Sequence, residues 1–316
     1  MTNEPPAFDQ QSLRARREEL RRRQTRRRRL AGGLIAIVAV AVIAVIALGG
    51  PGKSSRRAGH ATKAPKGRAP KGRRSSASAG TGTPRTQDQV IALRRLAKLA
   101  KPVYCGGRRG RYVALTFDDG PGPYTTLAMR KLRAAHAQAT WFLVAKSISS
   151  YPHIARREVS LGAIGDHTLT HPFLPGLSQS AMANEISGGK RAAEKASGTK
   201  VRLFRPPYGA RNSAIDRQAR KDGLVEVLWS MDSRDSLGAN YAGIAKNVKT
   251  GLRPGAIILM HENRGQTIRA MRTFLPALRR KHLRAVTVSE LLTRDPPSAA
   301  QLRVGPKGCG GGRSGA

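Results

Sequence analysis

The sequence has few of the residues on which several common functions depend. Aromatic residues make up only 4% of the 316 residues, too few for a row of stacking platforms along single-stranded nucleic acid. Its two cysteines, Cys105 and Cys309, stand far apart and form no CxxC pair, which excludes a zinc ribbon. Acidic residues are also scarce, with 19 Asp and Glu against 58 Lys and Arg and a formal net charge of +39. This positive charge is unevenly placed, so its position is more informative than its sum.

The first 48 residues combine a basic tail with a long uncharged segment. Residues 1–29 contain ten Arg, and residues 30–48 contain no charged side chain. The uncharged segment approaches the roughly 20 residues that a helix needs to cross the hydrocarbon core of a membrane. A cleavable signal peptide is the alternative, but its apolar region usually has about 7 to 15 residues. We therefore favour an uncleaved transmembrane anchor at residues 30–48.

The charges on either side of this segment predict its orientation. Ten Arg precede it, against six basic residues between Lys53 and Arg68, and the more basic flank stays in the cytoplasm. Residues 1–29 are then a cytoplasmic tail, and the rest of the chain lies outside a single-pass anchor in the cell membrane. If the segment is cleaved, near Ala47, the rest is secreted.

Residues 49–88 have the composition of a linker. Between residues 51 and 87 there are ten basic residues and no acidic one, in a background of Gly, Ser, Ala and Pro. Such a sequence buries too little apolar surface to fold, which predicts a disordered basic linker. Its simplest role is a solvated spacer, and its binding role would be contact with anionic lipid or wall polymer. The extracellular placement argues against a specific nucleic-acid partner.

From residue 89 the pattern changes to alternating strand-like and helical segments. Predicted strands cover residues 112–116, 140–144, 163–165, 201–204, 225–229, 256–260 and 285–286. Predicted helices cover residues 90–99, 124–136, 151–161, 179–197, 212–222, 241–251 and 266–281. This alternation predicts an α/β fold with a parallel sheet, open or closed into a barrel, and right-handed crossovers. We place the folded domain at residues 89–295 and a flexible tail at residues 296–316.

Polar residues follow the first and third predicted strands. Asp118 and Asp119 stand in a turn closed by Gly and Pro, and adjacent side chains converge on one site only beyond a strand end. Sites in parallel α/β folds are built at such ends, although a turn and helix cap is the common alternative. His167 and His171 are four residues apart, a spacing that lets both reach one metal ion. Two His residues with this spacing and no other ligand nearby are more often incidental than metal-binding.

Polar residues also follow the fourth, fifth and sixth predicted strands. Arg205 begins the segment Arg-Pro-Pro-Tyr-Gly, and its guanidinium suits a carboxylate partner, the alternative being a surface Arg in a turn. Asp232 and Asp235 follow the fifth strand, either as site residues or as caps. His261 stands at the tip of the sixth, where a single His is more often structural. Five polar groups at successive strand ends are hard to explain by stability alone.

Together these segments resemble the ordered motifs of the polysaccharide deacetylase family, the NodB homology domain or carbohydrate esterase family 4. The motifs are Thr116–Gly120, His167–His171, Arg205–Gly209, Asp232–Asp235 and Leu259–His261. The resemblance covers roughly residues 110 to 293. It implies a distorted (β/α)7-type barrel and a divalent metal, and it makes residues 89–295 a catalytic domain that acts on N-acetyl groups of chitin-like or peptidoglycan sugars.

The resemblance implies three metal ligands, Asp119, His167 and His171. Three protein ligands leave a coordination position open for water or for the acetyl oxygen. Zinc is the usual metal of the family, and a site with two His and one Asp also accepts cobalt or nickel.

The resemblance also implies the catalytic groups. Asp118 matches the general base and Arg205 the cation that holds it, while His261 matches the general acid and Asp232 the carboxylate that orients it. The substrate-binding residues implied are Tyr208, through its backbone N–H, and Pro206 and Leu259, which shape an acetate pocket.

The function implied is a metal-dependent N-deacetylase that releases acetate from N-acetylated amino sugars of a cell-wall polysaccharide, with peptidoglycan favoured. Deacetylation of chitin or an exopolysaccharide, hydrolysis of an O-acetyl ester, and a non-catalytic glycan-binding barrel are the alternatives. One departure concerns the substrate. Many family members carry Trp after the second Asp of the fourth motif, as a wall of the sugar groove, whereas this chain has Ser236 and an earlier Trp229. The length and identity of the glycan are therefore left open.

The two cysteines lie before the first and after the last predicted strand. Cys105 lies just before the first strand, and Cys309 lies in the Gly-rich tail. An extracellular environment permits disulfides, and in a closed barrel the two ends of a domain can lie close together. We expect a Cys105–Cys309 disulfide, with two free thiols as the alternative.

Overall fold

The computed structural model describes residues 86–310. The predicted tail at residues 1–29, the anchor at residues 30–48 and nearly all of the linker at residues 49–88 lie outside this range. Within it, no helix has both the length and the apolar character needed to cross a membrane.

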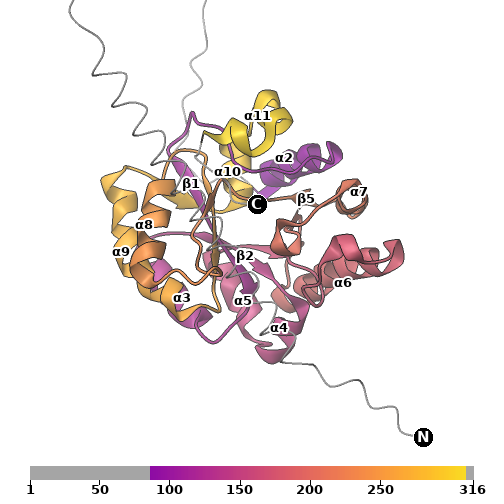
Figure 1. The fold of residues 1–316 in the computed structure, drawn as a ribbon, viewed down its shortest axis with the longest axis horizontal. Helices are drawn as coiled ribbons and strands as arrows, with labels where there is room; N and C mark the ends of the chain where they lie inside the picture. Colours follow the sequence, from indigo (N-terminus) through magenta and orange to yellow (C-terminus); the bar gives the residue numbers. More distant parts are fainter. Residues whose placement is uncertain (1–85, 311–316) are drawn as a thin grey trace, which may run out of the picture. The chain divides into compact units, whose positions relative to one another are not determined.

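A parallel sheet of eight strands organises the fold (Figure 1). Its order is β5-β4-β3-β2-β1-β7-β6, and β8 also pairs with β1. The strands are β1 Tyr112–Gly120, β2 Ala139–Leu143, β3 Gly162–Asp166, β4 Leu203–Phe204, β5 Val225–Glu226, β6 Met231–Asp232, β7 Ile257–His261 and β8 Arg284–Val286. All ladders between these strands are parallel. The sheet curls into an α/β half-barrel that is consistent with the expected distorted (β/α)7 fold.

Strand β1 shows why these residues form a sheet buried on both faces. Val113, Leu115 and Phe117 point into the larger apolar cluster, and Ala114 points to the other face and into the smaller one. All four side chains are fully buried. Parallel strands covered on both faces need such continuous apolar runs, and β1, at the centre of the order, therefore has neighbours along both edges.

Helices surround the sheet, with α3, α8 and α9 along one side and α6 and α7 along the opposite side (Figure 1). The α-helices are α2 Thr86–Lys98, α3 Thr125–Ala134, α4 Ala145–Ser150, α5 Ile154–Glu158, α6 Gln179–Ser197, α7 Ser213–Lys221, α8 Tyr241–Gly251, α9 Gly265–Arg280, α10 Val288–Arg294 and α11 Ala299–Val304. The short 3-10 helices are η1 Val159–Leu161, η2 Leu174–Gly176, η3 Pro207–Gly209 and η4 Gly305–Cys309.

The bounds of α6 and α8 coincide with the predicted helices at residues 179–197 and 241–251. Both begin at capping side chains, since Ser178 Oγ accepts a hydrogen bond from the backbone N–H of Ala181 and Asn240 Oδ1 accepts one from Gly243. The predicted helix at residues 151–161 is instead divided into α5 and η1. The predicted strand at residues 225–229 is only two residues long, and β6 follows it unpredicted, because a two-residue strand carries no periodic pattern.

The C-terminal segment differs from the flexible tail that we expected at residues 296–316. Residues 299–309 form α11 and η4, and α11 begins with a capping box between Ser298 and Gln301. Cys309 forms the expected disulfide with Cys105, with a Cα–Cα distance of 5.9 Å. This bond ties the C-terminal helices to the residues that precede β1.

Reduction of this disulfide is expected to destabilise the domain. The bond spans 204 residues, and closing a loop of that length removes about 5 kcal/mol of chain entropy from the unfolded state in the entropic model, against about 2–5 kcal/mol measured for native disulfides. Urea unfolding of the Cys105→Ser/Cys309→Ser variant should show this loss, and wild type in reductant should match it. An unchanged midpoint in both would contradict the expectation.

Candidate active site

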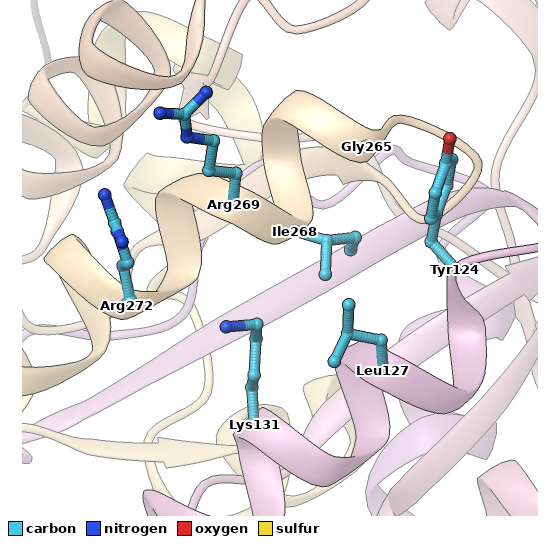
Figure 2. A pocket seen from close by; sticks show the side chains of 7 residues that line it. All are labelled: Tyr124, Leu127, Lys131, Gly265, Ile268, Arg269 and Arg272. Atoms are coloured by element: carbon cyan, nitrogen blue, oxygen red, sulfur yellow. The ribbon is translucent and has the colours of Figure 1, made fainter.

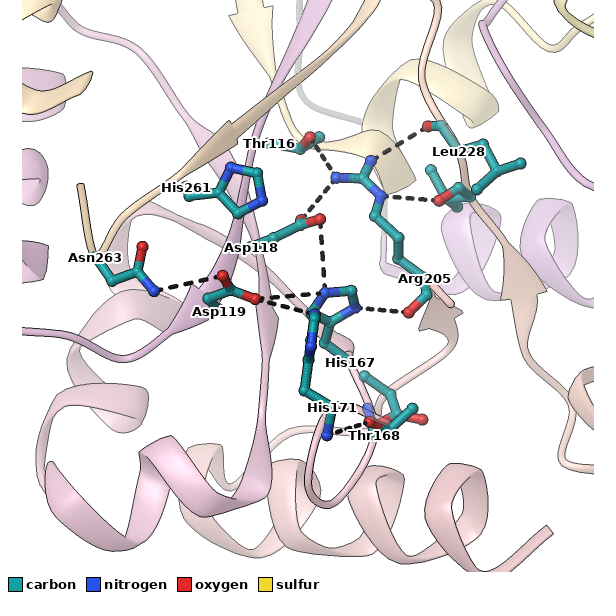
Figure 3. Close-up of polar contacts among 12 residues, drawn as sticks. Thr116, Asp118, Asp119, His167, Thr168, His171, Arg205, Leu228, His261 and Asn263 are labelled. Atoms are coloured by element: carbon teal, nitrogen blue, oxygen red, sulfur yellow. Dashed lines mark hydrogen bonds and ion pairs between the residues drawn. The ribbon is translucent and has the colours of Figure 1, made fainter. Parts of the chain in front are cut away.

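The carboxyl end of β1 brings two adjacent Asp side chains to one place. The pairing of β1 with β2 is irregular between Asp118 and Gly120, and Asp119 has a φ of 68°, in the left-handed region. This local break in the strand cancels the usual alternation of neighbouring side chains. Asp118 and Asp119 consequently lie between the ring of His261 and the rings of His167 and His171 (Figure 3).

Arg205 holds Asp118 in place. Its Nη1 donates to Asp118 Oδ1 at 2.7 Å and to Thr116 Oγ1 at 2.8 Å. The remaining guanidinium nitrogens donate to the backbone carbonyls of Val227 and Leu228. The Arg205 side chain is fully buried and Asp118 is only 2% exposed, so little water screens their attraction. The guanidinium therefore stabilises negative charge on Asp118.

The two predicted His ligands face Asp119. His171 Nε2 lies 3.3 Å from Asp119 Oδ1, and His167 Nε2 lies 3.7 Å from the same oxygen. His167 Nδ1 lies 2.7 Å from the carbonyl oxygen of Arg205. A carbonyl only accepts, so Nδ1 carries the proton and the Nε2 lone pair is left to face Asp119.

Buried contacts fix the loop that carries these His residues. Asp166 Oδ1 accepts a hydrogen bond from the backbone N–H of Thr168, whose Oγ1 accepts one from His171. Helix α6 packs so closely on this loop that a Cβ added to Gly189 would lie 2.3 Å from Asp166 Oδ1. Complete burial raises the pKa of Asp166 well above its usual value, which favours a protonated carboxyl group there. Packing and hydrogen bonds thus hold this loop in place.

The donor set fits a divalent cation. One ligand atom from each of Asp119, His167 and His171 lies within 4.8 Å of the others, and Asp119 Oδ1 is buried with no hydrogen-bond partner in the described part of the chain. Burial lowers the pKa of His167 despite the nearby Asp118 and Asp119, which favours the neutral imidazole that binds metals. Burial acts to raise the pKa of Asp119, but His167, His261 and His171 outweigh it and lower that pKa, so the carboxylate stays ionised.

His261 stands at the end of β7, in register with Asp118 on β1. Its Nδ1 lies 2.7 Å from Asp235 Oδ1, and its backbone N–H donates to Asp235 Oδ2 at 2.7 Å. Thr267 Oγ1 donates to the same Oδ2 at 2.6 Å. Burial acts to lower the pKa of His261, but the hydrogen bond and charge of Asp235 outweigh it and raise that pKa to about 9.

The carboxylate that orients His261 is therefore Asp235, and the prediction that Asp232 does so is wrong. Asp232 lies on β6, and its Oδ1 accepts a hydrogen bond from the backbone N–H of Arg234 at 2.6 Å. Arg234 has a φ of 61°, and this turn carries Asp235 back to the end of β7. The motif contains two Asp residues, and nothing in its spacing tells which of them reaches the histidine.

The three predicted substrate-binding residues lie on elements that also carry site residues. The exposed ring of Tyr208 packs edge-on against His171, with ring centroids 4.7 Å apart, and Tyr208 has a φ of 62° in the turn that follows β4. Pro206 is buried at the start of that turn. Leu259 is buried on β7 and pairs with Asp232 on β6.

Asn263 is a site residue that the motifs did not predict. Its Nδ2 donates to Asp119 Oδ2 at 3.4 Å (Figure 3), so it orients the oxygen of Asp119 that faces away from the histidines. The sequence signal that could have pointed to Asn263 is its position two residues after His261. Ser236 directly follows Asp235, and its backbone N–H donates to Asp235 Oδ1.

Sequence comparison shows which known proteins this chain resembles. The family model for polysaccharide deacetylase matches residues 106–227. A peptidoglycan-N-acetylglucosamine deacetylase of Bacillus cereus is 36% identical over 189 residues, covering 58% of this chain and 88% of that protein. A chitooligosaccharide deacetylase of a Bradyrhizobium species is 33% identical over 188 residues, covering 54% of this chain and 86% of that protein.

A solved structure shows the same likeness. The crystal structure of a peptidoglycan N-acetylglucosamine deacetylase, in complex with an N-oxidanyl-benzamide compound, superposes with a TM-score of 0.58 at 30% identity. The superposition covers 60% of this chain and 92% of the other. The sequence and the fold agree, and the chain belongs to the polysaccharide deacetylase family.

Proposed function

We propose that the chain is a metal-dependent N-deacetylase that releases acetate from the N-acetylated amino sugars of peptidoglycan. The observation that carries this proposal is the placement of Asp118 and His261 side by side at the ends of β1 and β7, next to the cluster of Asp119, His167 and His171 (Figure 3). Hydrolysis of an acetamide needs a base for water, a stabiliser for the oxyanion and an acid for the departing amine. Each of these has a candidate in or next to the cluster.

A divalent cation would be held by Asp119, His167 and His171, and we propose zinc, with cobalt or nickel as alternatives. When bound, such a cation polarises an amide carbonyl and lowers the pKa of water. The chain's own part begins with Asp118, whose Oδ2 faces this cluster 3.8 Å from His167 Nε2. Asp118 Oδ2 accepts the proton of the attacking water, while Arg205 keeps Oδ1 in place on the other side.

His261 is the proposed general acid, and it lies on the side of Asp118 that faces away from His167 and His171 (Figure 3). Its Nδ1–H donates to Asp235, which leaves Nε2 to carry the proton that the amine nitrogen takes as the C–N bond breaks. Asp235 stabilises the charged imidazolium before that transfer. The backbone N–H of Tyr208 is the proposed donor to the oxyanion, and Pro206 and Leu259 are the proposed walls of the acetyl pocket.

Removal of divalent metal is expected to abolish acetate release from peptidoglycan strands, and addition of zinc to restore it. The same treatment gives a readout without activity, since a cation that binds only the folded chain raises the melting temperature. His171→Ala should lose the zinc-dependent rise in melting temperature, whereas His153→Ala, outside the site, should keep it. Activity that survives exhaustive chelation would contradict the metal assignment.

Asp235→Asn is expected to move the high-pH limb of the kcat/KM profile to lower pH, by on the order of one or two units. The acid form of His261 is lost as pH rises through its pKa, and Asp235 raises that pKa, so removing the carboxylate lowers it. Asp232→Asn is the matched control and should leave the limb in place. If only Asp232→Asn shifted the limb, Asp232 rather than Asp235 would be the carboxylate that orients His261.

The alternative substrates predict different products. A chitin or exopolysaccharide deacetylase would prefer neutral oligomers of N-acetylglucosamine to peptidoglycan strands, and an O-acetyl esterase would release acetate without creating a free amine. A non-catalytic glycan-binding barrel would release none. The presence of Asp118, Asp119, His167, His171 and His261 at one site supports an enzyme over the binding module.

We further propose that residues 30–48 anchor the chain in the cell membrane with the N-terminus in the cytoplasm and the catalytic domain outside. The apolar length of this segment and the ten Arg before it support the proposal, and the disulfide is of the kind that persists outside the cytoplasm. The basic segment at residues 49–88 would then hold the domain near anionic lipid or wall polymer.

A further inference from the structure

A groove between α3 and α9 is separate from the cluster that performs the chemistry. Its volume is about 280 Å³. One wall carries Tyr124, Leu127 and Lys131, and the other carries Ile268, Arg269 and Arg272 (Figure 2). Residues three and four positions apart share one face of a helix, so each set forms a stripe along its helix. The two stripes face each other across the gap.

The floor of this groove is apolar. Ile268 is buried, while Leu127 is 37% exposed and Tyr124 is 41% exposed. Figure 2 shows Leu127 and Ile268 next to each other across the gap between the helices. Apolar side chains that line a concave surface can contact the apolar groups of a ligand. A ligand here would place small apolar groups on these two residues.

The rim of the groove is cationic and lacks acidic partners. Neither α3 nor α9 contains Asp or Glu. In the part of the chain that the structure describes, Lys131, Arg269 and Arg272 form no ion pair, in contrast to the Arg211–Asp216 pair. Arg269 is held by stacking on the ring of Tyr241 at 4.1 Å. Three cations are therefore available to an anionic ligand.

The groove opens near the reaction centre. Asn263 bonds to Asp119, and α9 begins two residues later at Gly265, where an added Cβ would lie 3.2 Å from the ring of Tyr124. The four residue-to-residue steps from His261 to Gly265 span at most about 14 Å. A polymer whose sugar lies at His261 could therefore place a substituent in the groove.

We propose that this groove binds the acidic peptide carried by a peptidoglycan strand whose N-acetylated sugar occupies the active site. The inference rests on the proposed function and narrows its substrate. Peptidoglycan carries peptides with carboxylates and small apolar side chains, whereas chitin is neutral and unsubstituted. The cationic rim and apolar floor complement the peptides of peptidoglycan, whereas chitin has no group that would bind there. The groove thus selects the peptide-bearing polymer.

The double variant Lys131→Gln/Arg272→Gln tests this proposal. On solubilised peptide-bearing strands, its KM should rise roughly tenfold with kcat retained, the equivalent of one or two weakened charge contacts. On strands stripped of peptides by an amidase, and on chitooligomers, its kinetics should equal those of wild type. Arg130→Gln/Arg279→Gln is the matched control, since it removes the same charge from the same helices outside the groove. It should leave all three substrates unaffected.

Binding of labelled strands to the full chain separates this proposal from the proposed function. If no substrate yields acetate, the proposed function fails, while tighter binding of peptide-bearing than of stripped strands, lost in the Lys131→Gln/Arg272→Gln variant only, still supports the groove. Equal losses on stripped strands, or no change on any strand, would overturn the groove. The proposal would also be overturned if the Lys131→Gln/Arg272→Gln variant lost binding to polyglycerol phosphate or to phosphatidylglycerol vesicles but kept binding to peptide-bearing strands.

Discussion

Asp118→Asn is expected to reduce acetate release by about 10²- to 10⁴-fold, the usual contribution of a general base. Asp118 Oδ2 faces the cluster of Asp119, His167 and His171, while Oδ1 is held by Arg205. Asn keeps the shape of the side chain and can still accept a bond from Arg205, but it cannot take up the proton of a water molecule. The loss should therefore appear in kcat, measured by acetate release from N-acetylated strands.

Two controls separate this effect from loss of the site. Zinc content and the zinc-dependent rise in melting temperature should be retained in Asp118→Asn, because the proposed ligands are untouched. Asp88→Asn, on the exposed side of α2, should keep full activity. If Asp118→Asn retains more than about a tenth of the wild-type rate, well above the range expected for a lost base, then Asp118 is not the base.

Arg205→Met is expected to cost about 3–5 kcal/mol of stability, as is usual when one partner of a buried ion pair is removed. The fully buried guanidinium bonds to Asp118, to Thr116 and to two backbone carbonyls, and it lies 4.2 Å from the ring of Phe142. Met fills part of the space, but it leaves the charge on Asp118 buried without its cation.

Urea unfolding measures this cost directly. Arg220→Met, on the exposed face of α7, removes the same charge and should change the unfolding free energy by less than about 0.5 kcal/mol. Combining Arg205→Met with Asp118→Asn should recover part of the loss, because the unpaired charge is then gone. An Arg205→Met variant as stable as wild type would show that the pair does not support the fold.

The sequence predicted most of the sheet because its strands are apolar runs bounded by Gly, Pro and Asp. Strand β1 was recognisable from four consecutive apolar residues, Tyr112 to Leu115, and α6 and α8 from apolar periodicity. The resemblance to the family predicted the three proposed metal ligands, and they lie together because the carboxyl ends of parallel strands meet at one edge.

Other features depend on contacts that no local pattern reports. Asp235 rather than Asp232 reaches His261 because of a left-handed turn at Arg234. Helices α11 and η4 are fixed to the domain by a bond between cysteines 204 residues apart. The groove between α3 and α9 arises from two helices that are separated by 130 residues of chain and meet only in the folded domain.

The most direct test of the central claim is the parallel measurement of acetate and of free amine released from peptidoglycan strands by the zinc-loaded chain. Hydrolysis of N-acetyl groups yields one new primary amine for each acetate, and we expect this one-to-one ratio in wild type and neither product above background in Asp118→Asn. Acetate without amine would identify an esterase, and the absence of both products would show that Asp118, His261 and the proposed metal ligands do not form an N-deacetylase.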